Sequence, residues 1–143
     1  MRVLAIDPGS KNIGLAISDP SGTIANPLSI VKHESRTKDT DLIAGMVVEN
    51  EVELVIVGCS FDGEGLPTYE GRKAKRFASE LAEKIKVQVK LWNEDFSTQI
   101  ARSSRIQMGA KRKNRKGHLD DLAATIILQS FLDYGMNRKY SDE

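Results

Sequence analysis

Three short apolar stretches, separated by turn residues, lie at the start of the chain. Residues 3–7 are almost wholly apolar, and residues 13–19 alternate between large apolar side chains and small or polar ones. Residues 25–31 follow the turn signal "DPSG" and form the third stretch. Alternation with a period of two, bounded by Gly, Pro, Asn and Ser, indicates strands joined by tight turns. The pattern therefore predicts three antiparallel strands, the first of which ends at Asp7.

After residue 40, helical periodicity alternates with continuous apolar runs. The first helical segment carries one apolar side, formed by Leu42, Ile43, Met46 and Val47. The run "LVIVG" is typical of a strand that is covered on both faces. The pattern predicts helices over residues 40–49, 69–86, 97–106 and 119–134, and strands over residues 54–58 and 87–92. A hairpin sheet followed by alternating helix and strand predicts a mixed α/β sheet with helices on its faces.

The length of the chain bounds its organisation. A chain of 143 residues suits one compact domain over residues 1–143. Residues 107–117 lack apolar periodicity, so we expect a mobile loop there, and residues 136–143 are expected to form a loose tail. No internal repeat or long linker interrupts the chain.

Composition narrows the class of protein. The chain is 40% hydrophobic and 29% charged, and no apolar run approaches the roughly 20 residues of a membrane helix. The N-terminus has no basic start followed by an apolar block, so we expect no export and a cytoplasmic location. The single cysteine, Cys59, cannot form an internal disulfide, and we expect it to be a packed residue and not a nucleophile.

Basic residues gather in two segments, although the formal net charge is only +1. The segments read "GRKAKR" and "KRKNRK", and the second directly precedes an acidic pair. Clusters of this kind either form a solvated surface or position the phosphate backbone of a nucleic acid. We predict that the chain binds nucleic acid and has no membrane partner. The residues predicted to contact phosphate are Lys11, Arg72, Lys73, Arg76, Lys111, Arg112, Lys113, Arg115 and Lys116.

Three acidic residues lie where predicted elements begin or end. Asp7 ends the first strand, Glu94 follows the strand of residues 87–92, and Asp120 begins the last helix. Ligand sites gather at strand ends in open α/β sheets, and carboxylates brought together repel one another unless cations hold them. Oxygen ligands suit Mg²⁺ or Mn²⁺, and two such ions about 3.5–4 Å apart can support phosphodiester cleavage. Each acid alone also has a structural interpretation, as a turn, surface or helix-start residue.

The last helix carries two neighbouring acids, and helical spacing separates them. Asp120 shares a face with apolar positions, namely Ala123, Ala124, Ile127 and Phe131. Asp121 shares a face with polar positions, namely Thr125, Gln129 and Asp133. We therefore predict that Asp120 points toward the sheet, where an unpaired charge is expensive. Asp121 stays open as a bystander, a helix-start acid or an auxiliary ligand, and His118 as an auxiliary group for proton transfer.

With these residues assembled, the chain resembles the YqgF/RuvX family, a RuvC-like branch of the ribonuclease H-like fold. The resemblance rests on four segments in order, "AIDPGSKNIGLAISD", "VIVGCSFDGEG", "LWNEDFST" and "KRKNRKGHLDDLAATIILQSFLD". It implies a five-stranded mixed sheet with helices on both faces and an acidic triad at Asp7, Glu94 and Asp120. The family usually carries Arg where this chain has Asn12 and Asp95.

The resemblance implies an activity as well as a fold. It implies a metal-dependent endonuclease that binds two Mg²⁺ or Mn²⁺ ions and processes the precursor of 16S ribosomal RNA. One alternative is a Holliday junction resolvase that acts on four-way DNA as a homodimer, so the chain is expected to be a monomer or a homodimer. Another is a non-catalytic module that binds nucleic acid. A sugar-kinase-like ATP site is disfavoured, because such proteins need two domains of this size.

Overall fold

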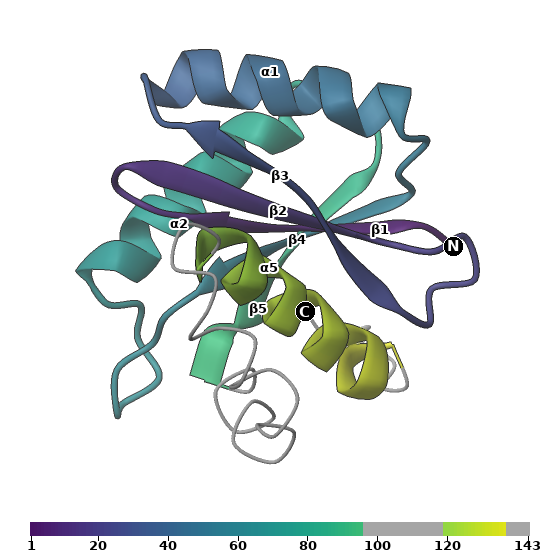
Figure 1. The fold of residues 1–143 in the computed structure, drawn as a ribbon. Helices are drawn as coiled ribbons and strands as arrows, with labels where there is room; N and C mark the ends of the chain where they lie inside the picture. Colours follow the sequence, from purple (N-terminus) through teal and green to yellow (C-terminus); the bar gives the residue numbers. More distant parts are fainter. Residues whose placement is uncertain (96–118, 137–143) are drawn as a thin grey trace.

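A five-stranded sheet with helices on both faces forms the protein (Figure 1). The computed structural model describes residues 1–95 and 119–136, and residues 119–121 by their backbone alone. The predicted helix over residues 97–106, the predicted loop over residues 107–117 and all but the first residue of the predicted tail therefore lie outside the described residues.

The strand order is β3-β2-β1-β4-β5. β1 pairs antiparallel with β2 and β2 with β3, whereas β4 pairs in parallel with both β1 and β5. The strands β1 to β5 span Val3–Pro8, Asn12–Ser18, Ala25–Lys32, Leu54–Cys59 and Gln88–Asn93. The prediction of a mixed sheet with three antiparallel strands at its start is confirmed, and each predicted strand end lies within one residue of the observed one.

Three α-helices of the described ranges pack on this sheet. Figure 1 shows α1 and α2 on one face and α5 on the other, as expected for a sheet whose central strands are apolar on both sides. A single π-helical turn, η2, continues α5. These elements span Arg36–Glu49 (α1), Tyr69–Ala82 (α2), Leu119–Ser130 (α5) and Phe131–Gly135 (η2).

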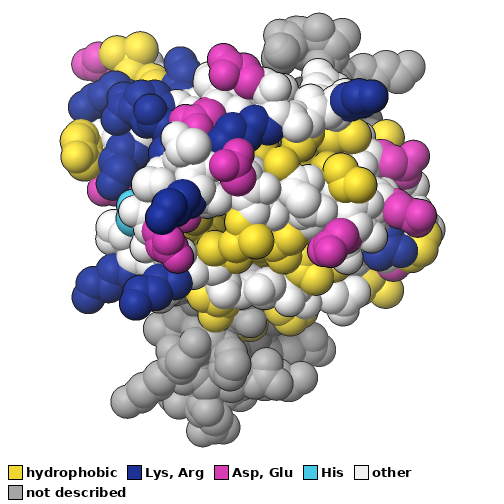
Figure 2. Space-filling model, turned by 90° about the horizontal axis from the view of Figure 1, so that it is seen from above, with side chains coloured by type: hydrophobic (Ala, Val, Ile, Leu, Met, Phe, Trp, Pro, Cys, Tyr) yellow, Lys and Arg dark blue, Asp and Glu magenta, His cyan; other side chains and the backbone are white. Residues whose placement is uncertain are grey.

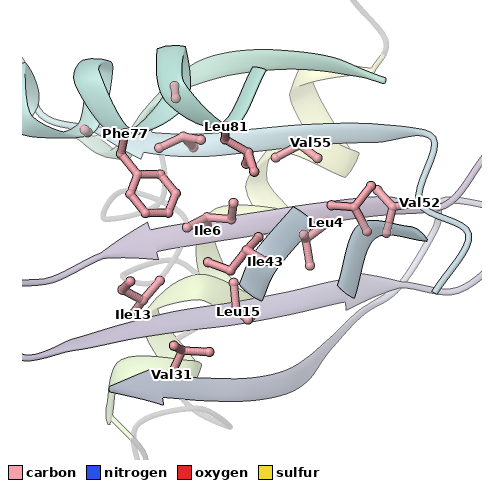
Figure 3. Packing of buried hydrophobic residues seen from close by; sticks show 14 of the residues in the cluster. Leu4, Ile6, Ile13, Leu15, Val31, Ile43, Val52, Val55, Phe77 and Leu81 are labelled. Carbon is pink, nitrogen blue, oxygen red and sulfur yellow. The ribbon is translucent and has the colours of Figure 1, made fainter. Parts of the chain in front are cut away.

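Two apolar layers hold the sheet between its helices. In Figure 3, Leu4 and Ile6 of β1 lie in one layer with side chains of the covering helices, namely Ile43 of α1 and Phe77 and Leu81 of α2. The alternate residues of the strands form the second layer beneath α5, together with Trp92. Because both layers draw on the same strands, β1 and β4 are apolar at nearly every position, which explains their continuous apolar runs. Cys59 is 1% exposed, as expected of a packed residue.

The predicted helix boundaries are wrong at two places for local reasons. α1 begins at Arg36 and not at residue 40, because the Ser35 side chain accepts a hydrogen bond from Lys38 N (3.1 Å) and caps the helix. α2 ends at Ala82 and not at residue 86, because Lys84 N bonds Leu81 O (2.9 Å) and tightens the last turn. The last helix runs as far as predicted, but η2 closes it with a bond from Met136 N to Phe131 O.

The predicted apolar face of α1 is also wrong in part. Ile43 and Val47 are buried as expected, whereas Leu42 is 53% exposed. The polar residues Asp39 and Thr40 take its place on the buried face. Their hydrogen bonds explain this, since Thr40 Oγ1 donates to Arg36 O (2.8 Å) within the helix. The bonds of Asp39 are described with the site below.

The direction of α5 decides which part of the chain meets the carboxyl end of β1. Met136, just after η2, lies near the start of β1. Its Cε is 3.6 Å from the place where a Cβ on Gly22 would stand, and Met1 O is 2.9 Å from that place. α5 therefore begins toward the opposite end of the sheet, where β1 stops, as Figure 1 shows.

Candidate active site

Asp7 lies near the carboxyl end of β1, on the face of the sheet that α5 covers. Successive residues of a strand point to opposite faces, so Asp7 shares a face with Val3 and Ala5, which pack beneath α5. α5 covers this face less completely at Asp7 than at the start of the strand, since Asp7 is half-buried while Val3 and Ala5 are fully buried.

Glycines stand beside Asp7 on both neighbouring strands. The register pairs Asp7 with Gly14 of β2. On the other side it pairs Ile6 with Val57 of β4, so Gly58 follows beside Asp7. A Cβ on Gly58 would lie 2.8 Å from Ile127 Cδ1 of α5, so this glycine lets the helix close on the sheet. Neither neighbouring strand therefore adds a side chain beside the Asp7 carboxylate.

Glu94 directly follows β5, two residues beyond Trp92. It is half-buried, and burial raises the pKa of its carboxyl, with smaller contributions from the charges of Asp95 and Glu70. The charge of Glu94 in turn adds to burial in raising the pKa of the Cys59 thiol at the end of β4. Glu94 therefore lies close to the ends of both β4 and β5.

The parallel register brings Asp7 and Glu94 to the same edge of the sheet. β4 separates β1 from β5, so the backbones of the two strands that carry these acids lie two strand spacings, about 10 Å, apart. Within the described ranges no three His, Cys, Asp or Glu side chains come together as a metal site. Asp120 is the third acid that the sequence predicts. It lies in the first turn of α5, where the structure describes the backbone and not the side chains.

The helix face to which the sequence assigns Asp120 is buried in the later turns of α5 and in η2. Ala124, Ile127 and Phe131 are buried against the sheet, whereas Thr125 and Gln129 are half-buried. Gln129 Oε1 accepts a hydrogen bond from Ala25 N (3.0 Å), which explains why this polar side is also partly covered. α5 thus has the apolar side that the sequence predicts, and the inward orientation of Asp120 stays a prediction.

The described residues of the predicted phosphate-binding set lie near the end of the molecule that carries Asp7 and Glu94. Arg72 and Arg76 are exposed and Lys73 is partly exposed, all on the first two turns of α2. Arg72 and Lys73 lie against the Tyr69 ring, at 5.8 Å and 5.6 Å from its centroid. Figure 2, which views the molecule from the α1 side, shows Lys and Arg side chains gathered toward one end. The second basic segment, from Lys111 to Lys116, lies outside the described residues.

Asn12 and Asp95 each form a local hydrogen bond through the backbone. The Asn12 carbonyl accepts a hydrogen bond from Gly9 N (3.0 Å) and closes the hairpin turn, with Lys11 exposed at its tip. A Cβ on Gly9 would lie 2.4 Å from that carbonyl, so the turn needs glycine there. Asp95 N bonds Asn93 Oδ1 (2.9 Å), and its charge disfavours ionisation of Glu94.

Sequence reasoning missed a pair of residues beside this end of the sheet. His33 Nδ1 lies 2.5 Å from Asp39 Oδ2, and Asp39 is only 3% exposed. The two residues are six positions apart, on either side of a helix cap, and carry no motif. The signal for this pair is the acid Asp39 in the first turn of α1. The predicted helix begins only at residue 40, so the sequence pattern does not place Asp39 on the helix.

The chain is similar to known proteins over nearly its whole length. Residues 1–134 match the family described as "RuvX: Holliday junction resolvase". A relative from Desulforamulus reducens is 36% identical over 135 residues, which cover 94% of this chain and 98% of the relative. One from Thermoanaerobacter pseudethanolicus is 39% identical over 139 residues, which cover 96% of this chain and 100% of the relative. Both carry the name "Putative pre-16S rRNA nuclease".

Solved structures share the fold at lower identity. RuvC from T. thermophilus, in complex with a Holliday junction substrate, has a TM-score of 0.66 with 20% identity over 95% of each chain. The fowlpox virus Holliday junction resolvase has a TM-score of 0.53 with 17% identity, over 93% of this chain and 99% of the resolvase. These similarities establish the RuvC-like form of the ribonuclease H-like fold.

Proposed function

Because the chain belongs to the RuvX family, we propose that it is a metal-dependent endonuclease that cleaves the precursor of 16S ribosomal RNA. The proposal rests on relatives of that name that align over nearly the whole chain. The observation that carries it is the pairing of Asp7, flanked by two glycines, with the half-buried Glu94 at one edge of the sheet. Asp120 completes the triad in this proposal.

The described acids fit a divalent cation. Burial and the charges of Asp95 and Glu70 disfavour the ionised form of Glu94, and a bound cation offsets such a penalty. Carboxylate oxygens are the ligands that Mg²⁺ and Mn²⁺ prefer. Asp7, Glu94 and Asp120 would hold two such ions, which supply Lewis-acid activation of water and stabilisation of the leaving oxygen.

The residues of the chain position the substrate around these acids. β1 holds Asp7 between two neighbouring strands, so its carboxylate is placed by the sheet and not by a loop. Gly14 and Gly58, on the two neighbouring strands, add no side chain beside it. Lys73 and Arg76 of α2, with Lys11 of the hairpin turn, hold the phosphate backbone without reading its sequence. In this proposal the basic segment from Lys111 to Lys116 adds further phosphate contacts.

The experiment is a cleavage assay on a transcribed RNA that contains the 16S precursor ends, with Mg²⁺, Mn²⁺ or chelator. The unmodified protein is expected to cleave with either metal and not with chelator. Asp7→Asn and Asp120→Asn remove a ligand charge and should abolish cleavage. Glu49→Gln, at an exposed acid at the end of α1, serves as the matched control. Full cleavage by the Asp7→Asn protein would reject the assignment.

A second candidate substrate is four-way DNA, favoured by the family description and by the RuvC-like fold. A resolvase nicks two strands symmetrically and so needs a homodimer. Cleavage of junction DNA in the same assay, together with a dimer in light scattering, would favour this candidate. Binding of either substrate without cleavage would favour a non-catalytic module, which the loss of the two family arginines at Asn12 and Asp95 supports.

The proposed substrate also bears on location. None of the described helices is long and apolar enough to cross a membrane. A ribosomal RNA precursor is found in the cytoplasm, so the proposed function places the protein there.

A further inference from the structure

A cleft of about 290 Å³ lies beside the end of β1, between the first turns of α1 and α2. Pro8 and Gly9, which directly follow Asp7, form one wall, and the apolar floor comes from Ile13 and Phe77. Glu70 also lines the cleft, and its charge raises the pKa of Glu94. The cleft and the candidate active site therefore share one end of the molecule. The volume is close to that of the smallest ligand sites, roughly 300 Å³.

Cationic side chains stand on both sides of this cleft. Lys73 and Arg76 come from α2 and Arg36 from α1. Arg36 donates its Nε–H to Glu80 Oε1 (2.9 Å), and its side chain is 50% exposed. Arg76 forms no hydrogen bond or ion pair with another described residue. Such guanidinium groups are suited to a phosphate, which they bind through two hydrogen bonds.

Two acids line the same cleft, and their surroundings limit the repulsion of a phosphate. Glu70 Oε1 lies 4.0 Å from Lys73 Nζ, on the exposed rim. Asp39 accepts hydrogen bonds from His33 Nδ1 and from Glu34 N (3.1 Å). Three permanent cations line the cleft with these two carboxylates, and Arg36 is also paired with Glu80, which lies outside the lining. Arg76 is therefore the cation of the lining that is most available to a phosphate.

The His33–Asp39 pair adds a group that cations do not provide. A carboxylate only accepts hydrogen bonds, so His33 Nδ1 is the donor to Asp39. In the neutral ring, Nε2 is then the acceptor. No described residue bonds Nε2, and the ring is 41% exposed where it lines the cleft. The His33 backbone is held as well, because its N–H bonds Lys11 O (2.9 Å).

We propose that this cleft binds one nucleotide of an RNA substrate, with its phosphate on Arg36, Lys73 and Arg76 and its ribose 2′-hydroxyl donating to His33 Nε2. An acceptor fixed by a buried carboxylate distinguishes RNA from DNA, because only RNA has the 2′-hydroxyl donor. The inference rests on the proposed function, since it names RNA as the nucleic acid that reaches Asp7 and Glu94. It assigns roles to His33, Asp39 and Arg36 that the cleavage chemistry does not require.

The test measures binding without cleavage. The unmodified protein, in chelator at pH 8, is titrated against three fluorescently labelled 12-mers of one sequence: RNA, 2′-O-methyl RNA and DNA. One neutral hydrogen bond predicts that RNA binds about fivefold more tightly than the other two. Equal binding of all three would overturn the proposal, with no variant involved. Displacement of RNA by inorganic phosphate at the concentration of the RNA phosphates would do so too, by identifying a site for free phosphate.

Variants then separate the ribose contact from the phosphate contact. His33→Ala should lower RNA affinity to the DNA level and leave DNA affinity unchanged, whereas an equal loss for both would refute the ribose contact. Arg76→Gln, at an exposed residue, should weaken both by about fivefold and reduce the salt dependence by about one phosphate contact. Glu70→Gln removes a repelling charge and should tighten both. Unchanged affinity in the Arg76 and Glu70 variants would refute the phosphate site.

The two proposals fail in different assays. A protein that prefers RNA through His33 but never cleaves it would refute the nuclease and keep the cleft. A protein that cleaves the precursor but binds RNA and DNA alike would keep the nuclease and refute the cleft. Thermal unfolding of each variant, measured beside the unmodified protein, identifies any loss of affinity that comes from unfolding.

Discussion

The contact between Gly58 and α5 can be tested by a pair of substitutions. A Cβ on Gly58 would approach Ile127 Cδ1 to 2.8 Å, too close for the Ile127 side chain to keep its present position. Both residues are enclosed, since Ile127 is 3% exposed and Gly58 is the last residue but one of a fully buried strand. Ile127→Val removes the very atom that the new Cβ would meet. The two changes should therefore compensate each other.

The magnitudes follow from the two single changes. In Gly58→Ala, the loss of glycine's freedom in the unfolded chain stabilises by about 0.5–1 kcal/mol. Overpacking against Ile127 costs about 1–3 kcal/mol, so the variant is expected to be destabilised by up to about 2.5 kcal/mol. Ile127→Val alone should cost about 1 kcal/mol for the methyl group it removes. In the double variant the clash is gone and the new Cβ fills the space, so its stability should return to within about 1 kcal/mol of the unmodified protein.

Urea unfolding, followed by fluorescence of the single tryptophan, measures all four proteins. Trp92 is 5% exposed and packs edge-on against Phe131, with 5.3 Å between ring centroids, so unfolding of the α5 side changes its surroundings. The double-mutant cycle should give a favourable coupling of about 1–2 kcal/mol. Strictly additive losses would refute the contact and, with it, the argument that Gly58 sets the distance between α5 and the Asp7 edge.

Three further predictions follow from other contacts. The hydrogen bond from Arg36, then those from Lys84 and Thr37, lower the pKa of Glu80 from 4.5 to about 2, so stability should fall as the pH falls through this interval. Glu80→Gln should flatten that fall in acid unfolding curves, and an unchanged curve would contradict the pairing. Ser130→Ala removes the acceptor 2.7 Å from Trp92 Nε1 in a buried place, and should cost about 1–3 kcal/mol with a shifted tryptophan emission. An unshifted spectrum at full stability would disprove this bond. Asp7→Asn should abolish cleavage with thermal stability retained, and a cleavage rate near that of the unmodified protein would contradict its role.

Local sequence patterns predicted the strands better than the helix ends. β1 and β4 are covered on both faces, so almost every residue must be apolar, and that leaves an unmistakable run. The start of α1 was missed because Asp39 and Thr40 are buried through hydrogen bonds and not through apolar side chains. Periodicity detects only apolar burial, so it placed Leu42 inside and the cap at Ser35 went unnoticed.

The residues of the candidate site also differ in how far the sequence pattern predicts them. Asp7 and Glu94 are predicted because each stands at the end of a predicted strand, and the parallel register of β1, β4 and β5 brings the two strand ends to one edge of the sheet. The His33–Asp39 pair was not found, since it joins the end of β3 to the first turn of α1 only when that turn packs beside the hairpin. No spacing rule links a histidine to an acid six residues away across a helix cap.

The sequence by itself therefore determined the order of strands and helices, the membership of the family and the acids at the strand ends, because these depend on apolar pattern and on local motifs. Tertiary structure alone decided the glycines that flank Asp7, the raised pKa of Glu94 and the cleft between α1 and α2. Each of these depends on which strands become neighbours and on how closely a helix approaches the sheet. Such distances arise from packing between residues far apart in the chain, and no local pattern records them.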